Sequence, residues 1–121
     1  MSQTINSVVA FADQPVPQGP FITPPERLLA GSPQQTIANY FTDSSEQLIS
    51  GVWESSPGKW QAVSDRNEFC YILEGRVVIA DTRGGEKHFS AGDAFVIPKG
   101  FQGTWEVLEN TRKYYVIFTT A

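Results

Sequence analysis

The chain has 121 residues, 40% hydrophobic and 18% charged, which is enough for one hydrophobic core and too little for two ordinary domains. Its formal net charge is -4 and its nine lysines and arginines are scattered, so we expect no nucleic-acid partner. The apolar runs are short, the first residues lack the form of a signal peptide, and there is one cysteine. We therefore expect a cytoplasmic protein with no membrane span and no intrachain disulfide.

The N-terminal segment is rich in proline, with six of the eight prolines among the first 33 residues. Proline opposes both helix interiors and central strands, so residues 1–34 are expected to form an irregular arm. The arm also carries apolar side chains that need burial. It can pack on the chain's own barrel or on a second copy, and the second arrangement would make the protein a homodimer. The apolar residues of the arm are Val8, Val9, Phe11, Phe21, Ile22, Leu28 and Leu29.

From residue 35 to 121, short β-prone runs alternate with turn residues, a spacing that predicts an all-β sandwich or barrel. No sustained helical period is present, so any helix should be a single turn. Gly75 is expected to close one strand with a turn, after which the next strand returns antiparallel to it. The expected strands are 36–41, 47–53, 59–63, 69–73, 76–80, 94–97, 103–108 and 114–119.

Side-chain alternation places Glu68, Cys70 and Ile72 on one face of the predicted strand 69–73 and its entry. One face of a barrel strand looks into the barrel. A carboxylate at the start of an inward-facing strand is costly to bury unless it is paired or protonated, which makes Glu68 the leading candidate for a functional residue.

Two segments resemble the paired signatures of the cupin superfamily. Glu68 and Gly75 frame the first, residues 68–75, while Gly92, Pro98 and Gly100 punctuate the second, residues 92–100. Two further segments, 103–107 and 112–115, are similar to one branch of small single-domain barrels, related to ureidoglycine aminohydrolase and to the ethanolamine-utilisation cupin. The resemblance spans roughly the second half of the chain. It implies a double-sheet jelly roll, the closure typical of cupins.

The resemblance also implies where a metal would lie, because metal-bearing cupins supply two histidines and a glutamate from the first signature and a histidine from the second. Of these four ligands this chain retains Glu68 alone. One carboxylate and one neutral amide are a poor set for a divalent transition metal, so we expect no metal and no cofactor. The positions of the three histidines are held by Gln61, Val63 and Gly103, or by Ala62 and Ser64 in place of the first two with a shorter spacing.

Two roles are open for Glu68. As a ligand-binding group it would hold an ammonium or hydroxyl, or act as a general base with a raised pKa. As a structural group it would accept hydrogen bonds from Gln61 or from a backbone amide.

Several other residues are candidates for a ligand site or for the core. Four aromatic residues could line a small cup or simply fill the core. Gln61 and Lys113 could orient a polar or anionic ligand, although Lys113 is more usual as a solvated edge residue. Cys70 is expected to be a buried small hydrophobe, because a neighbouring carboxylate raises a thiol's pKa, and His88 is expected to be exposed on a hairpin. The four aromatic candidates are Trp60, Phe101, Trp105 and Tyr115.

The sequence thus predicts a metal-independent cupin that binds a small polar metabolite in its barrel, and it leaves open whether the ligand is turned over. One alternative, implied by the resemblance, is an enzyme of nitrogen metabolism like the ureidoglycine aminohydrolases. Another is a structural or accessory barrel whose role lies in its assembly.

Overall fold

The computed structural model describes residues 3–12 and 17–120. It is built from β-strands and contains one short 3-10 helix, and none of the described helices is long and apolar enough to cross a membrane. The elements are η1 (Ile5–Ser7), β1 (Gln18–Ile22), β2 (Leu28–Gly31), β3 (Gln34–Thr42), β4 (Leu48–Ser55), β5 (Gly58–Val63), β6 (Asn67–Asp81), β7 (Glu86–Ser90), β8 (Ala94–Ile97) and β9 (Gln102–Phe118).

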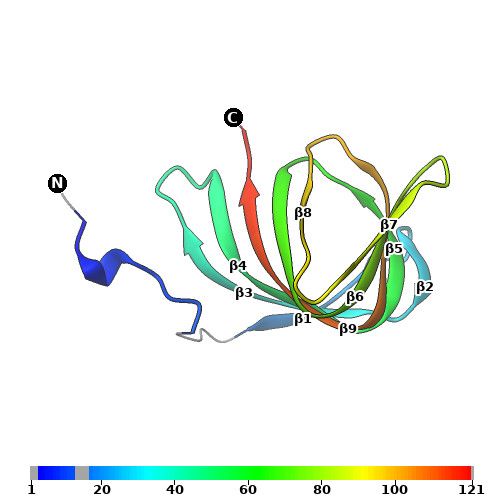
Figure 1. Cartoon of the computed structure of the whole chain (residues 1–121), viewed down its shortest axis with the longest axis horizontal. Coiled ribbons are helices and arrows are strands. Elements are labelled where there is room, and N and C mark those ends of the chain that lie inside the picture. Colours follow the sequence, from blue (N-terminus) through cyan, green and yellow to red (C-terminus); the bar gives the residue numbers. More distant parts are fainter. Residues whose placement is uncertain (1–2, 13–16, 121) are drawn as a thin grey trace.

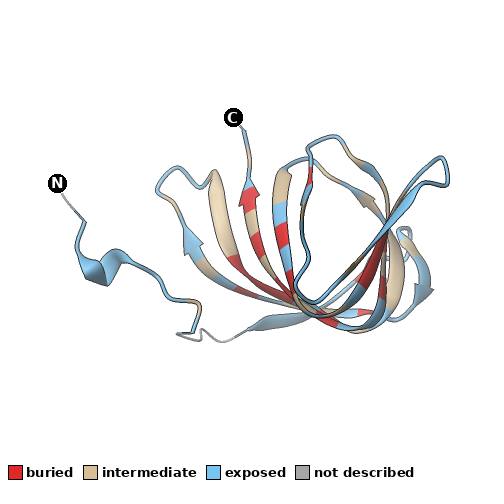
Figure 2. Ribbon diagram, viewed as in Figure 1, coloured by how far each residue is buried: buried red, intermediate tan, exposed pale blue. Residues whose placement is uncertain are grey.

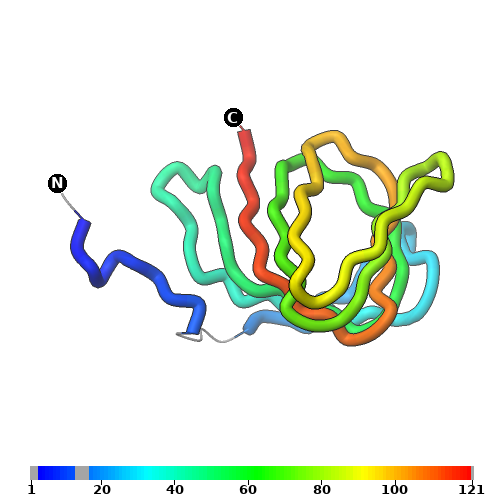
Figure 3. Tube along the Cα trace, in the orientation of Figure 1, coloured from blue at the N-terminus to red at the C-terminus, as the bar shows by residue number. Residues whose placement is uncertain are grey.

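The strands form one curled antiparallel sheet in the order β1-β3-β4-β9-β5-β2, with β6 pairing β7, β8 and β9 off this path. Two long strands, β6 and β9, pair with each other along almost their whole length and pass from one half of the sheet to the other (Figure 1). The first half of β9 pairs with β5 and its second half with β4. The predicted all-β barrel is therefore confirmed, and the trace in Figure 3 shows the chain curling around its interior.

The expected turn at Gly75 is wrong, because β6 runs through this residue without reversing. Gly75 has a φ of 96°, and the register between β6 and β9 shifts on both sides of it. Glycine adopts this backbone conformation without steric cost, so here it makes a bulge that bends a strand. The expected strands 69–73 and 76–80 are thus one strand, as are 103–108 and 114–119.

The proline-rich segment is less irregular than expected, because β1 and β2 lie within it and pair with β3 and β5. Both strands end the pairing path, so each has a free edge. An edge strand tolerates proline, at its free side or at a bulge, and Pro20 lies in β1 where the register with β3 shifts between Gln18 and Phe21. The arm and barrel boundary at residue 34 stays a prediction.

The hydrophobic core is formed mainly by the inward faces of β6 and β9. Cys70, Ile72, Val77 and Val107 are almost completely buried, and burial alternates along β9 with the period of two expected for a strand. Figure 2 shows the buried positions concentrated on the central strands, whereas residues 3–12 and the turn of the β6–β7 hairpin are mostly exposed.

Candidate functional site

A cavity of about 430 Å³ opens into the curl of the sheet, lined by side chains from β3, β4, β5, β6 and β9. All three tryptophans of the chain, Trp53, Trp60 and Trp105, contribute to its wall. Trp53 and Trp105 are buried, and Trp60 is half-buried. Their rings lie close together, with Trp53 centred 5.8 Å from Trp105 and 6.3 Å from Trp60.

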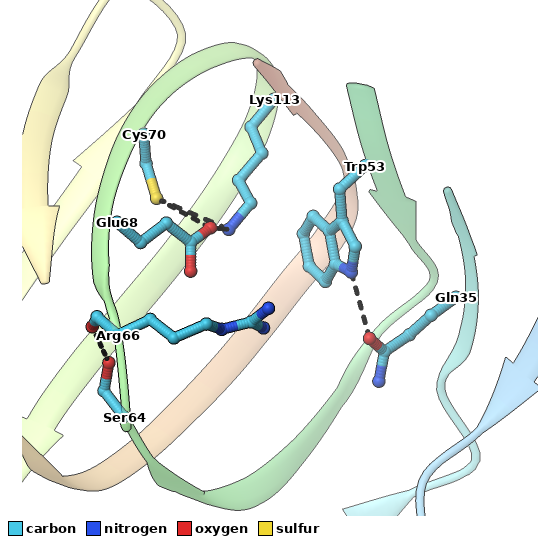
Figure 4. A network of polar contacts seen from close by, with 7 residues as sticks. All are labelled: Gln35, Trp53, Ser64, Arg66, Glu68, Cys70 and Lys113. Carbon is cyan, nitrogen blue, oxygen red and sulfur yellow. Dashed lines mark hydrogen bonds and ion pairs between the residues drawn. The ribbon is translucent and has the colours of Figure 1, made fainter. Parts of the chain in front are cut away.

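A buried ion pair lies at the inner end of this cavity (Figure 4). Glu68 enters from β6 and Lys113 from the second half of β9, and Lys113 Nζ donates to Glu68 Oε2 at 2.7 Å. The Lys113 side chain is 5% exposed and that of Glu68 is 23% exposed. The expectation of a solvated Lys113 is therefore wrong, because alternation along β9 turns this residue inward with Tyr115 and Ile117.

The Lys113 ammonium is also packed against aromatic rings. Its Nζ lies 4.2 Å from the ring centre of Trp105 and 4.7 Å from that of Trp53. Such contacts favour the cation electrostatically, and more strongly when water is excluded. Trp53 is itself held by a hydrogen bond from its Nε1 to Gln35 Oε1 at 2.9 Å. The built-in cation is thus fixed by a carboxylate and two indoles.

Cys70 lies beneath the pair and has no exposed surface. Its Sγ is 3.4 Å from Glu68 Oε2 and 3.4 Å from Lys113 Nζ. Burial raises the pKa of Cys70 to about 12, and Lys113 offsets this only in part. The thiol is therefore protonated and unreactive at neutral pH, in agreement with the expected role as a buried small hydrophobe.

The charge state of Glu68 does not fit the expected role of a general base with a raised pKa. Burial alone would raise its pKa, but the Lys113 ammonium outweighs burial and holds the pKa of Glu68 below its ordinary value. The expected general base with a raised pKa is therefore wrong, since sequence reasoning did not place a cation beside the carboxylate. Burial likewise opposes the charge on Lys113, yet attraction to Glu68 raises the pKa of that ammonium. Both groups are charged at neutral pH.

Tyr115 forms a second polar contact in the wall, donating its hydroxyl to Asn39 Oδ1 at 2.8 Å. Burial, followed by the negative charge of Glu68, raises the pKa of Tyr115 to about 12. The phenol therefore stays neutral and acts as a donor.

The outer part of the cavity is more open and carries Arg27, Gln61, Val63 and Arg66, all exposed to solvent. Arg66 comes from the turn before β6, and its side chain extends across the cavity below Glu68 towards Trp53 (Figure 4). Among the hydrogen bonds of the described residues, none joins Gln61 to Glu68. The ammonium of Lys113 binds Glu68 in place of Gln61, the side-chain partner expected from the sequence.

Six of the eight predicted site residues meet at this cavity. Cys70 is buried and does not line the cavity. Phe101 lines a second cavity of about 600 Å³, together with side chains of β6, β7 and β8. The six are Trp60, Gln61, Glu68, Trp105, Lys113 and Tyr115.

Sequence reasoning missed five polar and aromatic residues of the wall: Arg27, Gln35, Asn39, Trp53 and Arg66. Gln35 lies near the start of β3, one residue before the expected strand 36–41. Trp53 and Asn39 lie on expected strands. Side-chain alternation along those strands could have identified them as facing the same cavity as Glu68, but only if the strand pairing had been known. Arg27 and Arg66 lie in turns, where no periodic pattern applies.

The positions of the absent histidines are occupied by groups of other chemistry. Gln61 and Val63 line the cavity, and Gly103 pairs with Ala62 across β5 and β9. The described residues contain no group of three or more His, Cys, Asp or Glu side chains that could hold a metal ion. His88 is exposed, as expected, and its Nε2 lies 2.9 Å from Glu86 Oε1.

Comparison with known proteins identifies relatives of the chain. Residues 42–115 match the family of EutQ-like cupin domains. A DUF861 family protein of unknown function from Pseudomonas syringae pv. tomato superposes with a TM-score of 0.78 and 25% identity, covering 85% of this chain and 44% of that one. The EutQ protein of Clostridium difficile gives a TM-score of 0.64 and 23% identity, over 73% of this chain and 64% of that one.

A DUF861 family protein from Thermotoga maritima is 39% identical, with a TM-score of 0.51, over 53% of this chain and 73% of that one. The chain therefore spans less than half of the Pseudomonas protein and under two thirds of the Clostridium protein. No curated protein matches the sequence.

Proposed function

Because the chain belongs to the EutQ-like cupin family, we propose that it binds a small polar metabolite in the cavity of its barrel, without a transition metal. The observation that carries the proposal is the cavity of about 430 Å³, walled by three tryptophans and open at one end to polar side chains. Ligand sites combine apolar and aromatic walls with a few placed polar groups in this way.

The chemistry of the inner end argues against a metal. Glu68, the one carboxylate expected as a ligand, already binds the Lys113 ammonium at 2.7 Å. A divalent cation would have to displace that ammonium or lie beside it, and the donor next to Glu68, the Cys70 thiol, stays protonated because burial raises its pKa to about 12. Charge repulsion and the shortage of imidazole or thiolate ligands both oppose this.

The ion pair instead gives the cavity a fixed polar end. Lys113 and Glu68 hold each other in the charged state, so neither is available as an acid or base near neutral pH without ligand-driven rearrangement. We infer that the pair orients bound ligand and that the Tyr115 hydroxyl and Gln61 amide supply further hydrogen bonds.

A pooled-metabolite thermal-shift screen tests the proposal, followed by titration of single compounds monitored by tryptophan fluorescence. A true cavity ligand should raise the melting temperature of the wild type, and Trp60→Ala should weaken its binding. Tyr71→Ala, which truncates an exposed aromatic outside the cavity wall, is the matched control and should bind normally. A ligand that binds both variants equally would contradict the assignment of the cavity.

The alternative of an aminohydrolase acting on ureido compounds remains a prediction from the resemblance. In the same screen it would be distinguished by release of ammonia from a stabilising compound. A protein that binds no metabolite at millimolar concentration would favour the remaining alternative, a structural or accessory barrel.

We also propose that the protein is a homodimer. The arm leaves Ile5 80% and Val8 69% exposed, although Phe11 stacks on Tyr40 of the same chain with ring centres 4.5 Å apart. Packing of these arm residues on a second copy would remove that apolar surface from water.

A further inference from the structure

The cavity has a charge opposite to that of the whole chain. The protein carries a formal charge of -4, yet the cavity is lined by three cationic side chains and one carboxylate. Lys113 and Glu68 neutralise each other at 2.7 Å. The charge that remains for a ligand is therefore positive and belongs to Arg27 and Arg66.

Arg66 is the better placed of these two cations. Figure 4 shows its guanidinium lying across the cavity between Glu68 and Trp53. The Arg66 side chain is 46% exposed, and its one ion pair runs from Nε to Asp65 Oδ1 at 3.5 Å. Asp65 is 88% exposed, and a surface pair of this kind contributes little. Among the described residues the terminal nitrogens of Arg66 have neither a carboxylate partner nor a hydrogen-bond acceptor.

A guanidinium with free terminal nitrogens has a specific chemical preference. Its planar fork matches the two oxygens of a carboxylate, and such paired charge-assisted hydrogen bonds are among the strongest in proteins. An incoming ammonium would meet the reverse situation, since it would approach the cations of Arg27, Arg66 and Lys113, and Oε2 of the single carboxylate of the cavity is already bound by Lys113. The polar end of the cavity thus selects an anion and disfavours a cation.

The apolar part of the wall constrains the rest of the ligand. Trp60 lines the cavity together with the apolar side chains of Ile37 and Val63. A flat apolar body can pack against the indole.

We propose that the ligand is a small organic acid with a flat apolar body, whose carboxylate pairs with the guanidinium of Arg66. This inference rests on the proposed binding function and names its ligand class. Arg27, at the same mouth, adds to the attraction without a defined contact.

The test uses matched probes that differ in charge and share a body. Benzoate, phenylacetate and indole-3-acetate are compared with their neutral amides and with benzylamine and tryptamine, by calorimetric titration of the wild-type chain at low ionic strength. We expect at least one acid to bind, and its amide and the amines to bind at least tenfold more weakly. Added salt should weaken the acid, because the contact is partly exposed.

Variants of Arg66 separate its role from general attraction. Arg66→Gln should weaken the bound acid at least tenfold, and Arg66→Lys, which keeps the charge but loses the fork, should weaken it by less. Arg83→Gln, in the exposed β6–β7 hairpin, removes the same charge far from the cavity and should leave binding unchanged. Arg66 is exposed and outside the core, so circular dichroism should show that both variants remain folded.

Three results would overturn the inference. An amine or amide that binds as tightly as its acid, and loses affinity in Trp60→Ala, would leave the proposed binding function standing and refute the preference for anions. An acid that binds Arg66→Gln as well as the wild type would refute the role of Arg66. Failure of every probe, together with a metabolite screen without a hit, would remove the binding function as well.

Discussion

Replacing Glu68 by glutamine keeps the shape of the side chain but leaves the Lys113 ammonium buried without its counter-ion. Breaking a buried ion pair at one partner typically costs about 3–5 kcal/mol. We therefore expect Glu68→Gln to lower the free energy of unfolding by about this amount and the melting temperature by about 10 °C or more. Urea denaturation and thermal unfolding measure both quantities.

The matched control is the double variant Glu68→Gln with Lys113→Met, which removes both charges and keeps an apolar stem against Trp53 and Trp105. It should recover most of the stability lost in the single variant, because no uncompensated charge is left. If the Glu68→Gln variant is as stable as the wild type, the ion pair between Glu68 and Lys113 does not stabilise the protein in solution.

The same pair predicts how stability depends on pH. The pKa of Glu68 is lower in the folded than in the unfolded chain, where its ordinary value is 4.5. Its contribution is therefore fully present above about pH 4.5 and is lost as the pH falls through the lowered folded-state pKa. Urea unfolding from pH 7 down to pH 3 should show a steeper loss for the wild type than for the double variant. Parallel curves would contradict this origin.

At the scale of the strands, Gly51 allows β3, β4 and β9 to approach one another beside the cavity. It pairs with Asn39 and Tyr115, and a Cβ at this position would collide with the carbonyl oxygen of Ala38 and lie 2.7 Å from Tyr115 Oη. We expect Gly51→Ala to destabilise the fold by about 1–3 kcal/mol and to displace the Tyr115 ring. Thermal unfolding and the aromatic NMR signals of Tyr115 report the two effects.

Gly84→Asn is the control for that substitution. Gly84 lies in the β6–β7 hairpin, where a Cβ atom would meet no other atom within 4 Å, and asparagine tolerates its positive φ. Its melting temperature should stay within a few degrees of the wild type. Equal losses at the two glycines would mean that crowding at Gly51 is not the cause.

The strands were predictable from sequence where alternation and turn residues agree, as they do for most of the chain from residue 35 onward. β7 was expected only as a hairpin segment that carries His88 and was not among the expected strands. The continuous course of β6 was not, because a glycine that closes a turn and one that makes a bulge look alike without the partner strand. The strand β1 was missed for a related reason, since the proline that excludes a central strand is permitted at an edge. The strand β2 contains no proline itself and was missed because Pro25 and Pro33 flank it.

The candidate site was predictable only in part. The strand alternation identified Glu68 and its inward face, and the aromatic composition indicated a wall. The partner of Glu68 could not be found this way, because Lys113 lies 45 positions away and its inward direction depends on the register of β9. The turn residues Arg27 and Arg66 carry no periodic signal at all.

For the molecule as a whole, the exposed apolar arm predicts self-association. Light scattering after size exclusion should give twice the chain mass of 13.4 kDa at micromolar concentration. Deleting residues 1–12 removes Ile5, Val8 and Phe11, and should shift the protein towards monomer. A cut before Pro24 is unsuitable, because it would also remove β1 from the edge of β3.

If the chain of 121 residues is monomeric in this measurement, the arm covers its own barrel. In that case the deletion should lower the melting temperature while the protein stays monomeric, since Tyr40 and Tyr114 would lose their contacts with Phe11.

Metal content is a property of the whole purified protein and tests the proposed independence from metal. Elemental analysis of protein made without a histidine tag should find well below one equivalent of Mn, Fe, Ni or Zn per chain. The physical reason is that Lys113 already neutralises Glu68. About one tightly held equivalent, retained by the wild type and lost in Glu68→Gln, would refute the proposal.

The position of β9 in the chain has a consequence for biosynthesis. This strand pairs with β4, β5 and β6. Each of these three earlier strands therefore lacks one of its neighbours until β9 has been made. A nascent chain can form the β3–β4 and β6–β7 hairpins early, but it cannot close the barrel until residue 118 has left the ribosome. Ribosome-bound chains halted before residue 102 should therefore be digested rapidly by protease, and chains extended well past residue 118 should resist it.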